Sequence, residues 1–422
     1  MSQQSKQWGA IVIMIALFAM IAFVTNLCTP MATIIKNQGE ISNVLAQIGN
    51  YGNFVAYLVM GIPAGMLISK FGYKKTALIG LAVGCLGILI QWYSGQLDAK
   101  ENLGLVFGVY LVGAFIAGLC MCILNCVVNP MLNILGGGGN KGNQLIQIGG
   151  VFNSTAAVAC YILMGALIAD AAKAKIADAT PALMIALAIF VVAFIVILFT
   201  KIEEPEQAPV QLNLIKGAMS HRHFALGALA IFLYMGIEVG VPNFVQQYLV
   251  ADGIPAATVG LLVAVYWFMM LIGRFVGASI GSKVSSRAMI TVVSSVTIVL
   301  VLFGMFAPQG INVNFPGVDW GKLELIWQEI PVGIFAFLLV GLCTSVMWGA
   351  IFNMAVEGLG KYTAIASGIF MTMVFGCAVM MAIQAQVADF TDYITSFWVV
   401  VFCAAYLLFY ALIGSRVSHR EE

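Results

Sequence analysis

The sequence predicts an all-α membrane protein with 12 transmembrane helices in two pseudo-symmetric six-helix bundles. Of the 422 residues, 62% are hydrophobic and only 9% are charged, whereas an average soluble domain has about 25% charged residues. The apolar residues gather into twelve runs, each close to the roughly 20 residues that a helix needs to cross a bilayer. A long polar connector follows the sixth run and divides the chain into similar halves. These three features together indicate an integral membrane protein.

Each apolar run is expected to form one helix, because only a helix satisfies its own backbone polar groups inside lipid. Short polar connectors separate the runs. The spans are predicted at residues 9–30, 44–68, 76–93, 104–132, 143–169, 181–200, 223–248, 256–282, 287–307, 331–356, 362–388 and 393–415.

The connector after the sixth span sets the domain organisation. We expect an N-terminal six-helix bundle at residues 1–200, a cytoplasmic linker at residues 201–222 and a C-terminal six-helix bundle at residues 223–422. An even number of spans places both termini on one side of the membrane.

Two short glycine motifs recur in the two halves. A GxxxG motif at residues 61–65 reappears at residues 273–277, and the tripeptide Gly-Leu-Cys at residues 118–120 reappears at residues 341–343. Small residues at this spacing permit close helix packing and are common in membrane helices. Together with the symmetric helix count, they favour parallel repeats with a substrate site at the midplane between the halves.

The distribution of Lys and Arg predicts the orientation. With the N-terminus inside, 13 of them fall in cytoplasmic connectors and 5 fall on the other side. Cytoplasmic loops carry an excess of these residues in membrane proteins. We therefore expect both termini in the cytoplasm.

Two ionisable residues lie inside the predicted spans, Glu238 in the seventh and Arg274 in the eighth. Ionisable groups in hydrocarbon are costly, and each is a functional hypothesis. A rise of 1.5 Å per residue puts Glu238 about 22 Å and Arg274 about 12 Å from the cytoplasmic helix ends, which does not favour a direct pair. Glu238 either faces a watery cavity as a proton or ligand group or bonds neighbouring helices, and Arg274 is interpreted as a structural residue near the cytoplasmic gate.

Carboxamides are numerous in the spans of both halves. An amide offers a donor and an acceptor, which matches the hydroxyls of a neutral sugar. The alternative for each amide is a bond that joins neighbouring helices. The predicted substrate-binding residues are Asn26, Asn125, Asn129, Gln147, Asn153, Asn243, Gln246, Gln247, Trp348 and Asn353. Stacking faces for a sugar ring come from Trp348 and from Tyr234, Tyr266 and Trp267.

Other functional classes are poorly supported. The net charge of +1 leaves no basic tract for nucleic acid. All nine cysteines fall in apolar runs, and the three histidines fall in cytoplasmic segments, so neither a metal site nor an enzyme is expected. We expect no cofactor, and a monomer whose partners are membrane lipid and one small molecule.

Several short stretches resemble a known family. The turn at residues 65–74 resembles the cytoplasmic signature of the major facilitator superfamily, with Ser69 where an acidic residue is usual. More specifically, the chain resembles the fucose:proton symporter family, which includes glucose/galactose porters. The matching stretches lie at residues 62–65, 129–130, 152–154, 234–239, 273–275 and 357–360.

The resemblance implies the major facilitator fold and a sugar carrier of the bacterial inner membrane that works by alternating access. It gives Lys70 and Lys74 of the signature turn a gating or structural role. The family's fucose symporter has carboxylates in helices one and four, where this chain has Asn26 and Asn125. An amide does not exchange a proton near neutral pH, so that coupling route is absent.

Three modes of transport stay open: proton coupling through Glu238, sodium coupling through carbonyl and amide oxygens, and uncoupled facilitation. We favour Glu238 because a desolvated carboxyl can titrate near neutral pH. The rival functions are an exporter of small polar or amphipathic solutes and a membrane receptor that does not transport its ligand.

Overall fold

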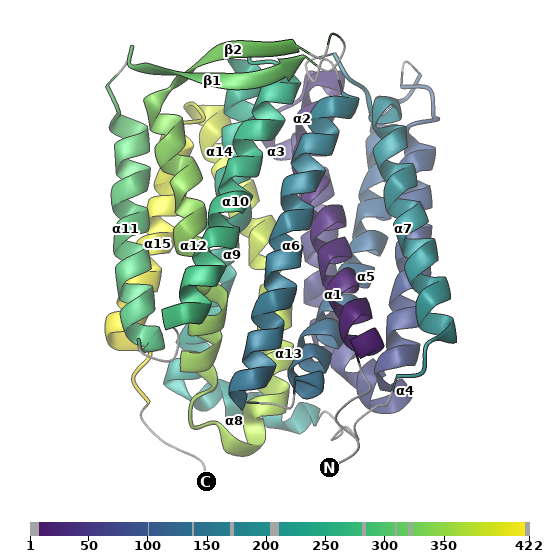
Figure 1. Ribbon diagram of the computed structural model, residues 1–422, viewed down its shortest axis with the longest axis vertical. Coiled ribbons are helices and arrows are strands. Elements are labelled where there is room, and N and C mark those ends of the chain that lie inside the picture. Colours follow the sequence, from purple (N-terminus) through teal and green to yellow (C-terminus); the bar gives the residue numbers. More distant parts are fainter. Residues whose placement is uncertain are drawn as a thin grey trace.

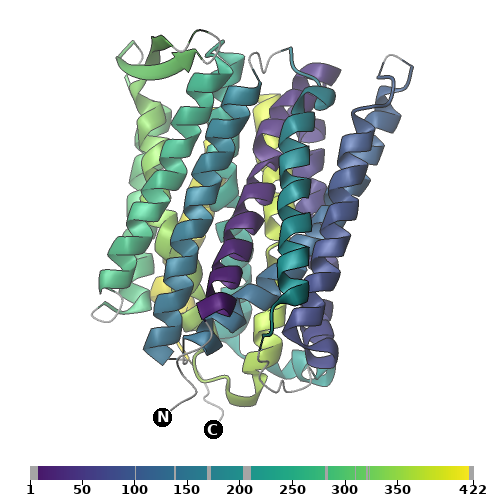
Figure 2. The same cartoon turned by 45° about the vertical axis from the view of Figure 1, so that its right-hand side comes forward.

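The computed structural model describes residues 8–99, 101–136, 139–168, 173–202, 211–280, 284–308, 310–319, 322 and 324–417. Long helices stand side by side, and a two-stranded hairpin lies across one end of them (Figures 1 and 2). The start of helix α1 and the last helical turn of the chain both lie at the end opposite the hairpin. We call these the hairpin end and the terminal end.

The N-terminal half contains six spans in seven helical elements. Helices α1 and α2 are two parts of one span that is interrupted at Leu27. The helices are α1 (Trp8–Asn26), α2 (Cys28–Gly39), α3 (Asn43–Ala46), α4 (Ile48–Ser94), α5 (Leu103–Leu135), α6 (Gly139–Leu167) and α7 (Thr180–Phe199).

The C-terminal half follows the short helix α8 (Ile215–Ser220). Its eleventh span is divided into α13 and α14, and its last span ends in a π-helical turn at Tyr410–Gly414. The helices are α9 (Arg222–Ala251), α10 (Ala256–Ile280), α11 (Ser286–Phe306), α12 (Val332–Val356), α13 (Thr363–Met373), α14 (Gly376–Phe390) and α15 (Trp398–Phe409).

Helix α4 contains two spans. Its 47 residues would extend about 70 Å if they were straight, more than twice the thickness of the hydrocarbon core. Gly72 breaks the helix with φ 81° and ψ 173°, a conformation that a residue with a Cβ atom rarely adopts. Eleven helices in the described chain are long and apolar enough to cross a membrane, and the break in α4 makes twelve spans. The predicted fold class is confirmed.

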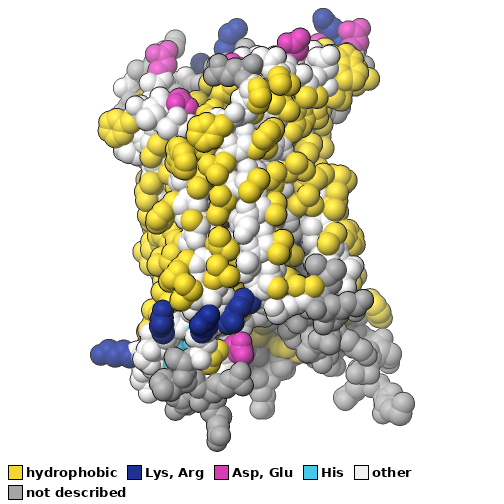
Figure 3. Space-filling model, turned by 90° about the vertical axis from the view of Figure 1, so that its left-hand side faces the viewer, with side chains coloured by type: hydrophobic (Ala, Val, Ile, Leu, Met, Phe, Trp, Pro, Cys, Tyr) yellow, Lys and Arg dark blue, Asp and Glu magenta, His cyan; other side chains and the backbone are white. Residues whose placement is uncertain are grey.

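The surface of the bundle suits a lipid environment. Figure 3 shows an apolar belt with charged side chains gathered at the two ends. Large apolar side chains such as Phe199, Phe306 and Phe402 are exposed on several helices. Because so much apolar surface is unfavourable in water, this belt indicates the part of the molecule that lies in the membrane.

The hairpin is an element that the sequence reasoning missed. Strands β1 (Asn312–Asp319) and β2 (Glu324–Pro331) pair antiparallel in the connector between α11 and α12. Ile330 is buried and Phe315 packs on Phe335, with 6.1 Å between ring centroids. The alternation of Asn with apolar residues over residues 312–315 was the signal available in the sequence.

The recurring Gly-Leu-Cys motif has the same packing role in both halves. Gly118 on α5 contacts the backbone of Asn53 on α4, and Gly341 on α12 contacts the backbone of Tyr266 on α10. In both halves, therefore, the motif packs equivalent spans together: the fourth span on the second, and the tenth span on the eighth. The GxxxG motif differs between halves: Gly61 contacts Thr372 of the other half, whereas Gly273 contacts α12 of its own half.

Candidate functional site

A buried network of amides joins the two halves toward the hairpin end. Asn243 on α9 accepts a hydrogen bond from Gln47 at 2.9 Å and donates to the Gln47 oxygen at 3.2 Å. Asn243 also lies 3.4 Å from the hydroxyl of Thr29 on α2, and Asn50 donates to Gln47 at 2.5 Å. All four side chains are buried. In this conformation the predicted ligand Asn243 joins the bundles.

The neighbouring amides on α9 belong to the same interface. Gln246 donates to the hydroxyl of Thr33 at 3.4 Å, and Gln247 donates to Asn243 at 2.5 Å. Both are buried, yet neither side-chain oxygen accepts a hydrogen bond within the described chain. Leaving such an acceptor unpaired costs about 1–3 kcal/mol, so this packing of α9 against α2 is unfavourable for both oxygens.

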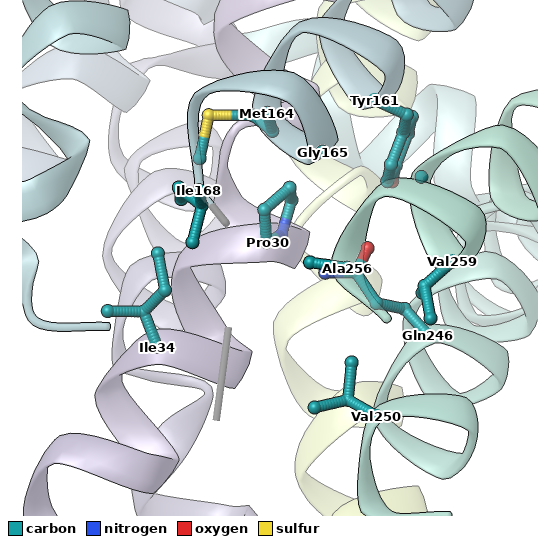
Figure 4. Close-up of a pocket in the computed structure, with 11 residues that line it drawn as sticks. Pro30, Ile34, Tyr161, Met164, Gly165, Ile168, Gln246, Val250, Ala256 and Val259 are labelled. Carbon is teal, nitrogen blue, oxygen red and sulfur yellow. The ribbon is translucent and has the colours of Figure 1, made fainter. Parts of the chain in front are cut away.

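Gln246 borders a small cavity between α2, α6, α9 and α10 (Figure 4). The hydroxyl of Tyr161, which also lines this cavity, has no hydrogen-bond partner within the described residues. The cavity volume is about 20 Å³, which is enough for one water molecule. This cavity is too small for a sugar.

A second polar cluster joins the halves at the surface of the hairpin end. Lys36 at the end of α2 donates to Tyr393 and, at 2.6 Å, to Asn43. The Asp389 carboxylate on α14 accepts from the backbone of Asn43 at 2.8 Å and of Val44 at 3.1 Å. Burial, with the nearby Asp389 carboxylate, raises the pKa of the Tyr393 phenol to about 12. The phenol therefore stays protonated and donates to Asn43 at 2.7 Å.

Asn125 and Asn129 are both partly accessible and lie four residues apart, on one face of the second half of α5. Asn125 donates to the Tyr57 hydroxyl at 2.9 Å and to its own helix at 3.1 Å. Asn129 donates to the backbone oxygen of Asn125 at 3.1 Å. Within the described residues, neither amide oxygen accepts a hydrogen bond, so both acceptors are available to a ligand.

The remaining residues that the sequence predicts to bind substrate are less favourably placed to contact it. Asn26 is buried and donates to its own helix at Ala22, 2.8 Å away. Asn153 donates to the Phe18 backbone at 2.9 Å and so packs α6 on α1. Asn353 is exposed near the terminal end of α12. The side chain of Gln147 lies outside the described residues.

Glu238 lies near the middle of α9, 16 residues from Arg222 and 13 from Ala251. Its side chain is partly accessible and within hydrogen-bonding reach of Tyr234. Tyr266 donates to the Glu238 backbone oxygen at 3.0 Å. Trp348 is partly accessible, and its ring centroid lies 6.3 Å from that of Tyr234. A carboxylate and aromatic faces therefore share one region of the C-terminal half.

Arg274 connects the C-terminal half to the N-terminal half. Its guanidinium donates to the backbone oxygen of Gly150 on α6 and lies 3.4 Å from the side-chain oxygen of Asn153. Arg274 also interacts electrostatically with Glu238, but its hydrogen bonds go to α6. This places a cation between the two bundles, toward the terminal end.

The lysines of the signature turn have different surroundings. Lys74 donates to the backbone oxygens of Leu198 at 3.0 Å and Thr200 at 2.8 Å, at the end of α7. A cation suits the negative end of a helix dipole, so Lys74 stabilises packing within its own half. Lys70 is exposed, with its ammonium 5.2 Å from the ring centroid of Phe71.

Sequence reasoning missed several polar residues that bond to the predicted ligands or join the two halves: Gln47, Asn50, Tyr57, Lys36, Asp389 and Tyr393. The spacing of Gln47, Asn50 and Asn53 at three-residue steps was a usable signal, because residues three apart share a helix face. In the part of the chain that the structure describes, no three His, Cys, Asp or Glu side chains group as metal ligands.

Comparison with known families decides the class of protein. The family model described as Major Facilitator Superfamily matches residues 11–383. The chain belongs to the major facilitator superfamily. Members of this superfamily are membrane transporters, so this chain is a multi-pass transporter and not an enzyme.

Curated relatives of this superfamily member cover nearly its whole length. A glucose/galactose transporter of Brucella abortus biovar 1 (strain 9-941) is 27% identical, over 98% of this chain and 96% of the relative. The L-fucose-proton symporter of Escherichia coli (strain K12) is 21% identical, over 96% of this chain and 92% of the relative.

Solved structures agree on the fold. A transporter of the superfamily, FucP, crystallised in the outward conformation, superposes with a TM-score of 0.69 at 19% identity, over 97% of this chain and 99% of that chain. The structure of a D-xylose-proton symporter gives a TM-score of 0.71 at 11% identity, with 97% and 98% covered.

Proposed function

We propose that this transporter carries a neutral monosaccharide across the bacterial inner membrane by alternating access between its two six-helix bundles, residues 1–200 and 223–422. The linker between them, residues 201–222, includes residues 203–210 that lie outside the described chain. The proposal rests most on Asn125 and Asn129, two partly accessible amides on one face of α5 whose side-chain nitrogens donate within the protein and whose oxygens accept no hydrogen bond from the described residues.

Uncharged acceptors suit an uncharged ligand. Carboxamide oxygens accept hydrogen bonds from sugar hydroxyls without the cost of burying an unpaired charge. The relatives named glucose/galactose transporter and L-fucose-proton symporter support the same substrate class. Trp348, which is partly accessible, supplies an aromatic face in the C-terminal half, next to the buried ring of Tyr234.

Alternating access explains why three predicted ligands are engaged between helices. Hydrogen bonds of Asn243, Gln246 and Gln247 gather at the hairpin end. We take this as the conformation closed on that side, in which the amides hold the bundles together. The bias of Lys and Arg toward the terminal end supports a cytoplasmic location for both termini and places the hairpin outside.

Glu238 is the proposed coupling residue, and H⁺ is the proposed coupling ion. It is a half-buried carboxyl group near the middle of its helix, within hydrogen-bonding reach of Tyr234. The relatives named as proton symporters support proton coupling. The alternatives are sodium coupling and uncoupled facilitation. Uptake measured with a pH gradient, with a sodium gradient and with neither distinguishes the three modes. We further propose that the monomer is sufficient, because the site lies between two bundles of one chain.

Uptake into proteoliposomes tests the function. Purified protein is reconstituted, and saturable uptake of labelled D-glucose, D-galactose and L-fucose is measured with and without a pH gradient and a sodium gradient. Saturable uptake of at least one sugar supports the proposal. No saturable uptake and no counterflow of any neutral monosaccharide would refute it.

A further inference from the structure

We propose a binding site for an anionic phospholipid at the terminal end of the C-terminal bundle, formed by Arg222, Arg287 and Arg416. These residues come from three separate parts of the sequence: the start of α9, the start of α11 and the segment after the last helical turn. The inference goes beyond the proposed function, because it concerns the lipid around the transporter and not its sugar. In the proposed orientation, this lipid belongs to the cytoplasmic leaflet.

Contacts around Tyr410 bring the three segments together. Its phenol donates to the backbone oxygen of His223, at the start of α9, over 3.2 Å. The same phenol interacts electrostatically with Arg287 on α11. The backbone N–H of Ser415 donates to the backbone oxygen of Tyr410 at 2.8 Å, and Arg416 is the next residue. The starts of α9 and α11 and the end of the last span therefore meet in one place.

The three arginines concentrate positive charge there. All three side chains are exposed, and within the described chain none of their guanidinium groups donates a hydrogen bond. The carboxylate of Glu357 lies near the start of α9, where it interacts electrostatically with His223. Three cations against this carboxylate leave an excess of positive charge among the described residues. An anion between them is favourable, and a guanidinium matches two oxygens of a phosphate group.

The arginines lie at the level of the lipid headgroups. Helix α11 has 21 residues, a length of about 30 Å, which is close to the thickness of the hydrocarbon core. At its hairpin end, the exposed Phe306 packs on the exposed Trp398, and Trp is enriched at membrane surfaces. Arg287 at the other end of α11 therefore lies at the opposite membrane surface. Figure 3 shows Lys and Arg side chains in a row along that edge of the apolar belt.

An exposed apolar surface continues from the arginines toward the middle of the membrane. Leu412 and Ile413 are exposed just before Arg416 in the last span. Val292 is exposed on α11, five residues after Arg287, and α11 contacts α15. Acyl chains can lie along these side chains while the phosphate contacts the guanidinium groups. A cationic end joined to an apolar strip favours a phospholipid over a free phosphate ion.

The position of the site gives the lipid a structural role. A phosphate held by all three arginines joins the first and third spans of the C-terminal bundle to the end of its last span. That last span ends in a π-helical turn at Tyr410–Gly414, a rare conformation that is frequent at functional sites. Because the lipid binds the folded protein, it should stabilise this end of the bundle.

Native mass spectrometry of the full chain in detergent tests the site. The protein is titrated with phosphatidylglycerol, which is anionic, and with phosphatidylcholine, which is zwitterionic and has the same acyl chains. We expect phosphatidylglycerol to bind more tightly. Arg287→Gln/Arg416→Gln should raise its dissociation constant about 30-fold, or about fivefold for each cation removed. The matched control is Lys75→Gln/Lys201→Gln, which removes two exposed cations near α4 and α7 and should leave this constant unchanged.

A second double variant and a competitor complete the experiment. Arg287→Lys/Arg416→Lys keeps both charges but loses the two-point contact with phosphate, so it should raise the dissociation constant about fivefold. This variant keeps the test usable if the Gln variant does not fold. Inorganic phosphate at millimolar concentration should not displace phosphatidylglycerol, because it has no acyl chains.

Three results would overturn the site. The first is an equal affinity for phosphatidylglycerol in the arginine variants and the lysine control. The second is an equal affinity of the unmodified protein for the two lipids. The third is displacement by inorganic phosphate, which would make this a site for a free anion. None of these results bears on sugar transport, which uptake into proteoliposomes tests separately.

Discussion

The guanidinium of Arg274 on α10 donates to the backbone oxygen of Gly150 on α6, and this hydrogen bond joins the two bundles. The same guanidinium lies 3.4 Å from the side-chain oxygen of Asn153, which in turn bonds the backbone of Phe18. A charged donor inside the membrane thus links α10 to α6 and, through Asn153, to α1. Polar residues at such positions are costly unless they are paired.

Arg274→Ala should destabilise the protein by about 2 kcal/mol, the scale of a hydrogen bond to a charged group. Thermal unfolding in detergent, followed by intrinsic fluorescence, measures the loss. Arg274→Lys keeps the charge and one donor and should lose less. Equal melting temperatures for Arg274→Ala and the unmodified protein would contradict a structural role for this contact.

Glu238→Gln should abolish sugar accumulation driven by a pH gradient and leave counterflow. The amide is nearly the same size as the carboxyl but carries no titratable proton. Uptake and counterflow in the same proteoliposome preparation separate coupling from binding. Unchanged accumulation would exclude Glu238 as the coupling residue and leave sodium coupling or facilitation.

Asn129→Ala should raise the sugar concentration for half-maximal uptake about fivefold, because one hydrogen bond of about 1 kcal/mol is lost. Asn312→Ala is the matched amide control, since Asn312 lies on the hairpin and bonds Glu329. A concentration series of labelled sugar gives both values. If the sugar concentration for half-maximal uptake is the same in both variants, Asn129 does not bind the sugar.

Asp389→Ala should open the hairpin end more often. The carboxylate accepts two backbone hydrogen bonds from the other bundle, at Asn43 and Val44. Losing about 1–2 kcal/mol of closing free energy changes the open-to-closed ratio about 5–30-fold. A thiol placed by Thr33→Cys should then react faster with an impermeant reagent. Asp252→Ala, at the exposed end of α9, is the control that should leave the rate unchanged.

Gly341→Ala should destabilise the C-terminal half by about 1–3 kcal/mol, the usual cost of overpacking. An added Cβ atom meets the backbone oxygen of Tyr266, which cannot move without shifting α10. Gly118→Ala should behave alike, because it meets the backbone of Asn53 on α4. Gly108→Ala, with open space around it, is the control. Equal melting temperatures for the three variants would contradict this prediction, because they would show that the helices adjust to the added Cβ atom at little cost.

The predicted boundary of the first span is too early in the sequence. The first span was predicted to end at Pro30, but α2 continues to Gly39. Its last turns carry Thr33, Lys36 and Asn37, which resemble a solvent-exposed connector. These side chains instead lie between the two bundles, and hydropathy cannot detect a polar residue that is sheltered by another part of the protein.

The sequence by itself determined the twelve spans, the two halves and the scarcity of intramembrane charge. It did so because a bilayer imposes the same demand on every segment, about 20 apolar residues in a helix. Only the tertiary structure decided which amides join the bundles and which keep a free oxygen. That choice depends on how each helix is rotated and on contacts between distant residues, such as Gln47 and Asn243, which are 196 positions apart.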